Sequence, residues 1–189
     1  MSEDNACRLA QAVLEGAAFL HARGICHRDI SLENVMLERL PDGSVSARIV
    51  DLGMAVAVPR DGRGGAVRLA AQGRCGKPAY ISPEVFADRS FDAASADIWS
   101  CACVVYAALL GIQPWKCAAA GTDPLYRAIA VHGKLAPLLA NWGLAKQVSP
   151  AAVDLLQRLL LDDPSKRLTS FDAALQHPWF AAIGARGGG

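Results

Sequence analysis

Apolar residues near the start of the chain recur every three or four positions, as they do on one face of a helix. The residues with this spacing within positions 8–22 are Leu9, Val13, Ala17 and Leu20. Gly24 follows them, and glycine readily adopts the left-handed conformation found beyond a helix C-terminus. The pattern predicts an amphipathic helix that ends just before the polar stretch HRDISLEN, residues 27–34.

Two short runs after that stretch have the character of strands. VMLERL begins at residue 35 and SVSARIVD ends at residue 51. Between them, PDG is a turn signal, because proline presets one backbone angle and glycine relieves steric crowding. We therefore expect a β-hairpin with HRDISLEN at one end and DLG, residues 51–53, at the other.

The second half of the chain is predicted to be mainly helical. Helices are expected at residues 97–110, 122–131, 150–161 and 170–176. Ser149 followed by Pro150 is typical of a helix start, and TSFD from Thr169 has the pattern of a capping box. The apolar run CACVVYAALLGI, residues 101–112, is shorter than the roughly 20 residues that a bilayer crossing needs, so it predicts a buried core helix.

Composition and charge narrow the class of protein. The 189 residues suffice for one domain, and 52% hydrophobic against 20% charged residues indicates a folded globular chain. The net charge of +1 gives no support for a nucleic-acid or anionic-membrane partner. The start MSEDNACR lacks the basic and then apolar residues of a secretion leader, so we expect a cytoplasmic protein with no membrane partner.

Six cysteines occur without a CxxC pair or the matching histidines of a structural zinc site. We interpret them as small, mostly buried hydrophobic residues of a reduced protein.

Several polar motifs follow one another in a characteristic order. HRD is joined by an asparagine five residues after the aspartate, by DLG beyond the expected hairpin, and by YISPE after a long glycine-rich loop. This ordered set resembles the C-terminal lobe of a eukaryotic protein kinase of the serine/threonine type. DIWSCACVVYAALLGIQPW from residue 97, DDPSKRLT from residue 162 and HPWF from residue 177 extend the resemblance over residues 8–180.

The resemblance implies an α+β, mainly α-helical fold: a kinase-like C-terminal lobe with a small β-hairpin at the cleft face. We expect a partial kinase domain over residues 1–182 and a disordered glycine-rich tail over residues 183–189. No G-x-G-x-x-G loop, V-A-I-K-like lysine or partner glutamate precedes residue 8, so we expect the N-terminal lobe to be absent and the chain as given to be inactive or weak.

The resemblance also implies roles in ATP-dependent phosphoryl transfer. Asp29 accepts or orients the proton of the substrate hydroxyl, Asn34 and Asp51 hold Mg²⁺, and Met36 joins Asn34 and Asp51 in binding ATP. Hard oxygen ligands suit that metal. His27 is expected to be structural. The alternatives are that Asp29 is a helix cap or turn residue and that Asp51 is a turn aspartate.

Two positions depart from the family pattern as if they had exchanged side chains. Ser31 stands where the family usually has lysine, and Lys77 stands where it usually has threonine. We predict that Lys77 reaches Asp29 and the transferred phosphate, with Ser31 supplying the hydrogen bond of the threonine; the alternative is that both positions have decayed. Leu52 replaces phenylalanine in DFG, which leaves the role of Asp51 intact.

The loop between the DLG motif and Lys77 predicts unusual regulation. In the family Arg28 receives a phosphorylated activation loop, but no serine, threonine or tyrosine lies between Met54 and Ala79. We call residues 54–77 the activation segment and residues 27–34 the catalytic loop. Activation-segment phosphorylation is therefore not expected to switch this protein, and redox control through Cys75 is a weaker alternative.

The resemblance assigns structural roles to three further charged residues. Glu84 and Arg167 are expected to form a buried ion pair. Asp97 is expected to hold the catalytic-loop backbone, to be a first-turn helix carboxylate, or both. The remaining histidines are interpreted as surface or packing residues: His21, His132 and His177.

The function implied is transfer of the ATP γ-phosphate to serine or threonine hydroxyls of a protein substrate. A non-catalytic binding module, in which the lobe docks partners through its helical face, is the alternative. The sequence upstream of Met1 in the gene separates the two hypotheses, since an in-frame glycine loop and lysine indicate a truncated active enzyme.

Overall fold

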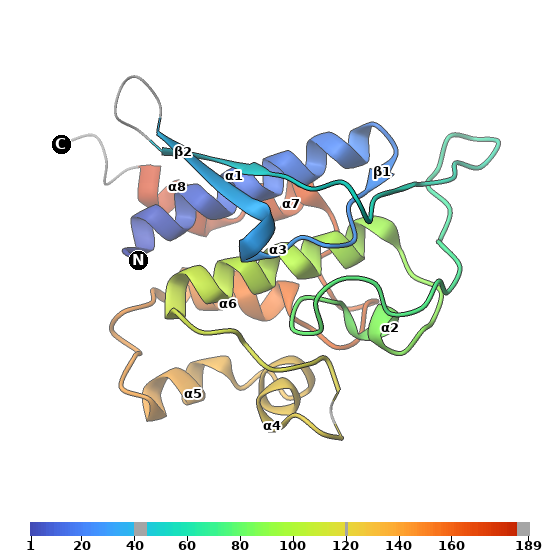
Figure 1. Ribbon diagram of the computed structural model, residues 1–189. Helices are drawn as coiled ribbons and strands as arrows, with labels where there is room; N and C mark the ends of the chain where they lie inside the picture. The colour runs from blue at the N-terminus through green and yellow to red at the C-terminus, as the bar shows by residue number, and fades with distance from the viewer. Residues whose placement is uncertain (40–44, 120, 185–189) are drawn as a thin grey trace.

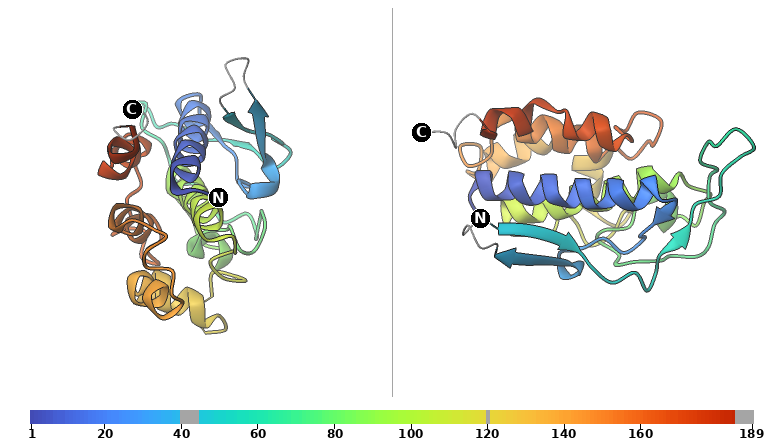
Figure 2. Two further views of the ribbon diagram at one scale, coloured as in Figure 1. Left: turned by 90° about the vertical axis from the view of Figure 1, so that its left-hand side faces the viewer. Right: turned by 90° about the horizontal axis from the view of Figure 1, so that it is seen from above.

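The computed structural model describes residues 1–39, 45–119 and 121–184, and it is mainly helical (Figure 1). Helix α1 (Glu3–Ala22) and helix α3 (Ala93–Leu110) pack against each other at the centre. A β-hairpin lies on one side of this pair. Three helices lie on the other side, namely α6 (Pro150–Leu159), α7 (Phe171–Leu175) and α8 (Pro178–Gly184) (Figure 2). The fold class predicted from the sequence, α+β and mainly helical, is confirmed.

Helix α1 begins earlier than the hydrophobic spacing predicted, at Glu3 rather than residue 8. The Ser2 side chain accepts a hydrogen bond from the backbone N–H of Asn5, and Glu3 and Asp4 complement the helix dipole in the first turn. Polar capping residues give no hydrophobic period, so the first turns were missed. The end is as predicted, with Gly24 in the left-handed region at φ 71°.

Helix α3 forms the buried centre of the molecule. Asp92 caps its N-terminus by accepting a hydrogen bond from the Ser95 N–H at 2.7 Å, and Gly111 ends it at φ 74°. The helix is long and apolar enough to cross a bilayer by length and composition alone, but 83% of that window is buried within the protein. The prediction of a buried core helix is therefore confirmed, with a start four residues before the expected position 97.

Two small antiparallel sheets bracket the polar motifs. Strands β2 (Val35–Arg39) and β3 (Val45–Ile49) form the expected hairpin, in register with Val35 opposite Ile49, and its PDG turn lies outside the described residues. Strands β1 (Ile25–Cys26) and β4 (Val56–Ala57) pair as well and were not predicted. The catalytic loop thus connects β1 to β2, and the DLG motif lies in the connection between β3 and β4.

The remaining helices are shorter. Helix α2 (Pro83–Phe86) follows the activation segment, α4 (Pro124–Tyr126) continues as a π-helical turn (Arg127–Val131), and α5 (Leu135–Asn141) precedes α6. Of these, α2 and α5 were not expected. The turns of α2, α4 and α5 fit between the longer helices and have too few residues to show a period of their own.

Two predicted helix starts have different outcomes. Ser149 caps α6 as predicted, by accepting a hydrogen bond from the Ala152 N–H. The capping box from Thr169 is wrong, because Ser170 is the residue that caps α7, through the Ala173 N–H. Helix α8 extends to Gly184 and so includes two residues assigned to the tail, whereas residues 185–189 lie outside the described residues.

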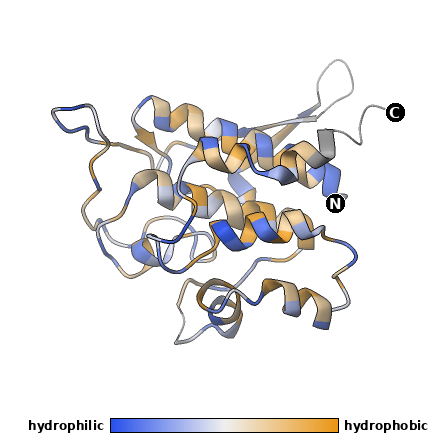
Figure 3. Ribbon diagram, turned by 180° about the vertical axis from the view of Figure 1, so that it is seen from behind, coloured by the Kyte–Doolittle hydropathy of each residue, from blue (hydrophilic) through white to orange (hydrophobic). Residues whose placement is uncertain are grey.

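The hydrophobic core lies between α1, α3 and α6. Within the core, the rings of Trp99, Trp115 and Tyr126 pack together in tilted and edge-on arrangements, with ring centroids 5.1–6.2 Å apart. Glu3 ties the chain termini together, since its carboxylate accepts hydrogen bonds from the Ser149 N–H at 2.9 Å and from the Trp179 indole at 2.7 Å. Hydrophobic residues predominate on the helices of the core, and the outermost turn of the activation segment is hydrophilic (Figure 3).

Candidate active site

The catalytic loop is anchored from below by a buried carboxylate of α3. Asp97, only 1% exposed, accepts hydrogen bonds from the backbone N–H of His27 at 2.7 Å and of Arg28 at 2.9 Å. The same carboxylate lies 2.7 Å from the His21 ring nitrogen. Asp97 therefore holds the loop backbone as the sequence predicted. It is not a first-turn carboxylate, because α3 begins at Ala93.

His27 and His21 are parts of this framework, His27 buried and His21 partly buried. His27, with no exposed surface, lies 3.1 Å from the carbonyl of Val50, and its other ring nitrogen accepts from the Asp29 N–H at 3.3 Å. His21 was expected to be a surface or packing residue, but it contacts Asp97 and stacks near the Phe171 ring at 5.1 Å. Such contacts across 76 positions leave no local signal in the sequence.

Four polar side chains meet at Asp29. The Asn34 amide donates to the Asp29 carbonyl and to its Oδ2 atom, both at 2.8 Å. Lys77 donates to the same Oδ2 at 3.2 Å and to Ser31 Oγ at 3.0 Å. The structure thus brings together Asp29, Ser31, Asn34 and Lys77, although Lys77 lies 48 positions after Asp29.

The second carboxylate oxygen of Asp29 is available. Oδ1 is buried and has no hydrogen-bond partner among the described residues. Gly76 closes over this point at φ 96°, and a Cβ there would lie 2.5 Å from the Arg28 carbonyl. Only glycine permits this approach without a shift of the backbone. One carboxylate oxygen is therefore held by Asn34 and Lys77, while the other lies buried next to Gly76 without a hydrogen-bond partner among the described residues.

Glu33 is a further partner that sequence reasoning missed. Its carboxylate lies 3.2 Å from the Lys77 ammonium and is mostly exposed. Burial alone lowers the pKa of Lys77, but the hydrogen bonds that its ammonium donates to Glu33 and Asp29, together with their negative charges, outweigh burial and raise the pKa above its ordinary value. Lys77 is therefore a stable cation at neutral pH.

The remaining predicted site residues lie along the hairpin and just beyond it. Asp51 has φ 66°, in the left-handed region where a non-glycine residue marks a position with a special role, and its Oδ1 accepts from the Gly53 N–H at 3.0 Å. The Val50 N–H donates to the Asn34 carbonyl at 2.9 Å, so Asp51 directly follows a residue bonded to Asn34. Met36, 60% exposed, lies on β2.

The activation segment is fastened without phosphate. Arg28 donates to the Gln72 side chain at 2.7 Å, and the Gly73 N–H donates to Asp88 at 2.8 Å. Leu69 exchanges two backbone hydrogen bonds with Phe91 at 2.9 and 3.0 Å. Gln72 was missed because an exposed glutamine has no distinctive pattern. It occupies the partner position of Arg28 that the resemblance assigned to a phosphorylated residue.

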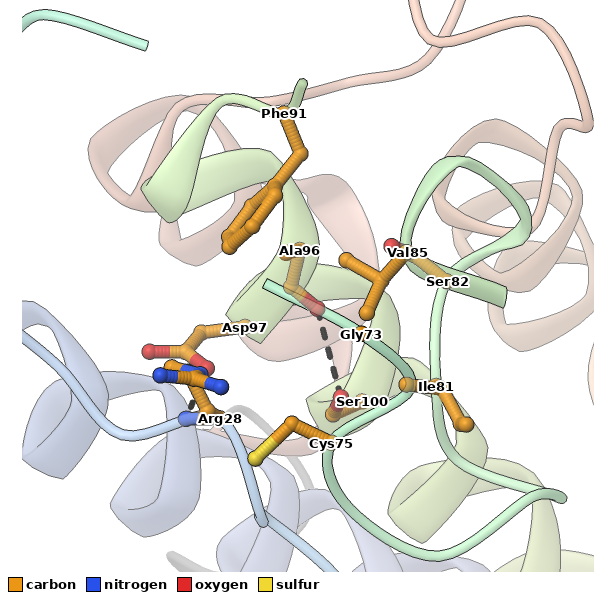
Figure 4. Close-up of a pocket in the computed structure, with 10 residues that line it drawn as sticks. All are labelled: Arg28, Gly73, Cys75, Ile81, Ser82, Val85, Phe91, Ala96, Asp97 and Ser100. Carbon is orange, nitrogen blue, oxygen red and sulfur yellow. Dashed lines mark hydrogen bonds between the residues drawn. The ribbon is translucent and has the colours of Figure 1, made fainter. Parts of the chain in front are cut away.

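A small cavity beneath the segment is too small for a ligand. Its volume is about 10 Å³, the space of roughly one water molecule. The lining side chains come from the catalytic loop, the activation segment, α2 and α3, as Figure 4 shows, and include Arg28, Cys75, Ser82, Asp97 and Ser100. This cavity therefore has too little volume to hold a substrate.

A buried ion pair holds helix α2, which follows the activation segment. Arg167, whose side chain has no exposed surface, makes two contacts with the Glu84 carboxylate of α2, at 2.8 and 3.0 Å. It also donates to Ser95 Oγ at 3.0 Å and lies over the Trp99 ring. The ion pair predicted from the sequence is confirmed.

The cysteines behave mainly as buried apolar residues. All six are free, and Cys7, Cys26, Cys101 and Cys103 are buried whereas Cys75 and Cys117 are partly exposed. Burial raises the pKa of the Cys7 thiol to about 11, and burial together with Asp97 raises that of Cys26. Cys26 comes close to His21 and Asp97, but the Asp97 carboxylate is already engaged by the His21 ring and by the backbone N–H groups of His27 and Arg28.

Comparison with known proteins assigns the family. The family model described as protein kinase domain matches residues 1–180. The chain therefore belongs to the protein kinase domain family. The match includes the residues before position 8, where the sequence motifs alone did not extend, in keeping with the early start of α1.

The similar proteins are serine/threonine kinases. The chain is 34% identical to CBL-interacting serine/threonine-protein kinase 16 of Arabidopsis thaliana over 95% of its own length and 36% of that protein. It is 31% identical to CBL-interacting protein kinase 31 of Oryza sativa subsp. japonica, with coverages of 95% and 36%. It is 30% identical to serine/threonine-protein kinase DCLK3 of Mus musculus, with coverages of 96% and 21%. The chain thus spans about a third or less of the length of these relatives.

Proposed function

We propose that this protein transfers the γ-phosphate of ATP to serine or threonine hydroxyls of a protein substrate. The observation that carries the proposal is the Asp29 carboxylate, with Oδ2 held by Asn34 and Lys77 and Oδ1 buried without a partner. A buried carboxylate oxygen without a hydrogen-bond partner lowers the stability of the fold. A role in binding or catalysis explains why such a group is retained. A substrate hydroxyl that donates to Oδ1 supplies the missing hydrogen bond and is aimed for attack.

The donor set fits magnesium and nucleotide phosphates. The Asn34 amide nitrogen is used by Asp29, which leaves its carbonyl oxygen as a ligand, and Asp51 offers a carboxylate that is exposed. Oxygen atoms of these two types are the ligands that Mg²⁺ prefers. When bound, the metal neutralises phosphate charge. Met36 offers an exposed apolar side chain on β2 for the nucleotide base.

The protein's own part in the reaction is to position groups and to supply fixed charge. Asp29 accepts the hydroxyl hydrogen bond and takes the proton as the oxygen attacks. Lys77 holds a positive charge 3.2 Å from the Asp29 carboxylate, where it stabilises the negative charge of the group in transfer. Asn34 fixes Asp29 through two hydrogen bonds at 2.8 Å, one to its backbone carbonyl and one to its side-chain Oδ2.

Lys77 and Ser31 form one unit in this proposal. The ammonium that the family usually places on the catalytic loop comes here from the activation segment, and Ser31 Oγ accepts from it at 3.0 Å. Decay of both positions is the less supported alternative, since decayed residues need not retain three polar contacts to Asp29, Ser31 and Glu33.

We also propose that the described residues correspond to the C-terminal lobe of a kinase. The support is their composition of helices around two small two-stranded sheets. A non-catalytic binding module is the second candidate function. The exposed apolar side chains of Met36, Leu37 and Leu52 favour it, because they offer contact area to another protein surface.

The test measures transfer of labelled γ-phosphate from MgATP to serine and threonine peptides by the full chain. Asp29→Asn is expected to lower the rate about 10²–10⁴-fold, because it removes the general base. Lys77→Ala is expected to lower it about 10²-fold, and Ser31→Lys with Lys77→Thr to restore most of the loss. The matched control is Asp172→Asn, which makes the same substitution at an exposed aspartate on α7.

Three outcomes count against the proposal. Undiminished transfer by Asp29→Asn removes Asp29 from the mechanism. An unaffected Lys77→Ala together with an inactive double exchange removes the paired role of Lys77 and Ser31. Absence of both transfer and MgATP binding, in the given chain and also in a chain extended by the residues encoded upstream of Met1, leaves the binding module as the function.

A further inference from the structure

The activation segment concentrates the positive charge of the chain. Residues 54–77 contain four arginines and Lys77 but a single acidic residue, Asp61, whereas the whole chain has a net charge of only +1. The rest of the chain is therefore net acidic. Arg28 on the catalytic loop and Arg89 after α2 add two more guanidinium groups to the same region. The basic side chains thus gather on the segment that delivers Lys77 to Asp29.

These arginines keep their charge unneutralised. Outside this region, Arg48, Arg158 and Arg167 pair with carboxylates at 2.7–2.9 Å, whereas Arg8, Arg23 and Arg127 make no ion pair among the described residues. Within the part of the chain that the structure describes, the region's guanidinium groups make no such pair within 4.0 Å. They belong to Arg28, Arg60, Arg63, Arg68, Arg74 and Arg89.

Three of the arginines are held in place by neutral groups. Arg60 donates to the Gly64 carbonyl at 3.0 Å, and Arg68 donates to the Ser90 carbonyl at 2.6 Å. Arg74 donates to the Phe86 carbonyl at 2.8 Å, with its guanidinium 4.1 Å from the centroid of that ring. Carbonyl groups and rings orient these side chains without cancelling their charge, so less ordering is needed when an anion binds.

Arg68 and Arg89 also line a cavity of a size suited to an acidic side chain. The cavity has a volume of about 320 Å³ and lies beside α2. Of its two carboxylates, Glu84 is paired with Arg167, whereas Asp162 accepts a hydrogen bond from the neutral Tyr126 hydroxyl and keeps its charge. Arg68 and Arg89 together outweigh the single charge of Asp162, so the net charge at this cavity is positive.

We propose that this surface, named the arginine surface and made of Arg28, Arg60, Arg63, Arg68, Arg74 and Arg89, binds acidic peptide segments. The phosphoryl acceptor is then a serine or threonine with aspartate or glutamate residues nearby. The inference rests on the proposed function, since it takes the bound peptide as the acceptor for Asp29. A peptide is favoured over a single-stranded nucleic acid because residues 54–77 contain no phenylalanine, tyrosine or tryptophan on which bases stack.

The test measures binding of fluorescein-labelled dodecapeptides to the full chain by anisotropy, without ATP. One peptide contains a central serine among glutamates, and two others contain glutamine or lysine in place of glutamate. The glutamate peptide is expected to bind at least tenfold more tightly than the glutamine peptide. Its affinity is expected to fall with salt, since the screening length drops from about 10 Å at 0.1 M to about 3 Å at 1 M.

Variants test the assignment to particular arginines. Arg68→Gln with Arg89→Gln removes two charges while keeping polar side chains, and is expected to weaken glutamate-peptide binding about three- to tenfold. The matched control Arg8→Gln with Arg23→Gln removes two exposed charges from α1 and is expected to leave binding unchanged. Thermal unfolding of each variant checks that the fold is retained.

The outcomes separate this inference from the proposed function. Equal binding of glutamate and glutamine peptides, an unaffected Arg68→Gln, Arg89→Gln variant, or tighter binding of an oligonucleotide of equal charge overturns the arginine surface. Glutamate-selective binding without any phosphate transfer supports the surface and contradicts catalysis. Transfer to lysine-flanked and glutamate-flanked serines at equal rates supports catalysis and contradicts the surface.

Discussion

The catalytic loop and the activation segment both contribute side chains to the Asp29 cluster, but they are held in different ways. The loop backbone is bonded to the buried carboxylate of Asp97, and its His27 is fully buried. The segment between residues 60 and 77 is mostly exposed and is held by separate contacts along its length, such as the backbone pair of Leu69 and Phe91 and the hydrogen bond between Arg28 and Gln72. The residue that completes the site, Lys77, comes from the less firmly held of the two.

Because of this difference, the placement of Asp29 and Asn34 depends on other contacts than the placement of Lys77. Asp29 and Asn34 keep their geometry with the core, because removing them from place means breaking buried hydrogen bonds. Lys77 keeps its geometry only while the segment is ordered. Order in the activation segment therefore controls whether the ammonium is present at Asp29, without any change in the catalytic loop.

The largest effect on stability is expected at the buried ion pair of α2, the helix that follows the activation segment. Arg167→Ala leaves the Glu84 carboxylate buried and unpaired, which costs about 3–5 kcal/mol of unfolding free energy. For a chain of this size the melting temperature falls by roughly 10 °C. Urea denaturation and thermal unfolding measure both. The double variant Glu84→Leu, Arg167→Met is expected to be more stable than Arg167→Ala, and the opposite order contradicts a penalty from the unpaired charge.

A smaller effect is expected from the anchor of the catalytic loop. Asp97→Asn keeps one acceptor oxygen but loses the charge that the His27 and Arg28 N–H groups share, for a cost of about 1–3 kcal/mol. Amide exchange is expected to accelerate at His27 and Arg28 while residues 68–77 keep their exchange rates. Equal acceleration in both regions shows that they are not independently held. Asp172→Asn on α7 controls for a change in charge alone.

Loss of the hydrogen bond between Gln72 and Arg28 is expected to change the global unfolding free energy very little. Gln72→Ala removes one exposed hydrogen bond to Arg28, so the unfolding free energy changes by less than about 1 kcal/mol. Amide exchange of residues 70–77 is expected to rise several-fold. Gln72→Glu, which forms an ion pair with Arg28, is expected to slow that exchange below the level of the unmodified chain. Identical exchange in all three chains rules out Gln72 as a fastener of the segment.

The same contrast explains which features sequence reasoning found. The helical spacing of Leu9, Val13 and Ala17 identified α1 because a helix of 20 residues must bury one face. Asp29, Asn34 and Lys77 were singled out because the motifs fall in a fixed order along the chain. Strands β1 and β4 were missed, since two residues each form no alternating pattern and depend on pairing across 32 positions.

The site residues that were missed are exposed polar residues with long-range partners. Gln72 bonds to Arg28 across 44 positions, and Glu33 reaches Lys77 from another segment. Neither residue type is unusual in a loop, so only the folded geometry reveals the contact. His21 was interpreted as packing, although its contact with Asp97 spans 76 positions. Contacts of this kind are set by the tertiary fold rather than by local sequence.

The last test leaves the stability unchanged and compares the two regions through their thiols. Cys26 lies directly before the catalytic loop, where burial and Asp97 raise its pKa, whereas Cys75 lies partly exposed in the activation segment. A thiol-specific reagent at pH 7.5 is therefore expected to modify Cys75 and Cys117 and to spare the four buried cysteines, including Cys7 with its pKa of about 11. Mass spectrometry of the labelled peptides identifies the sites. Labelling of Cys26 at the rate of Cys75 means that the catalytic loop opens as readily as the segment, and the contrast between the two regions is then lost.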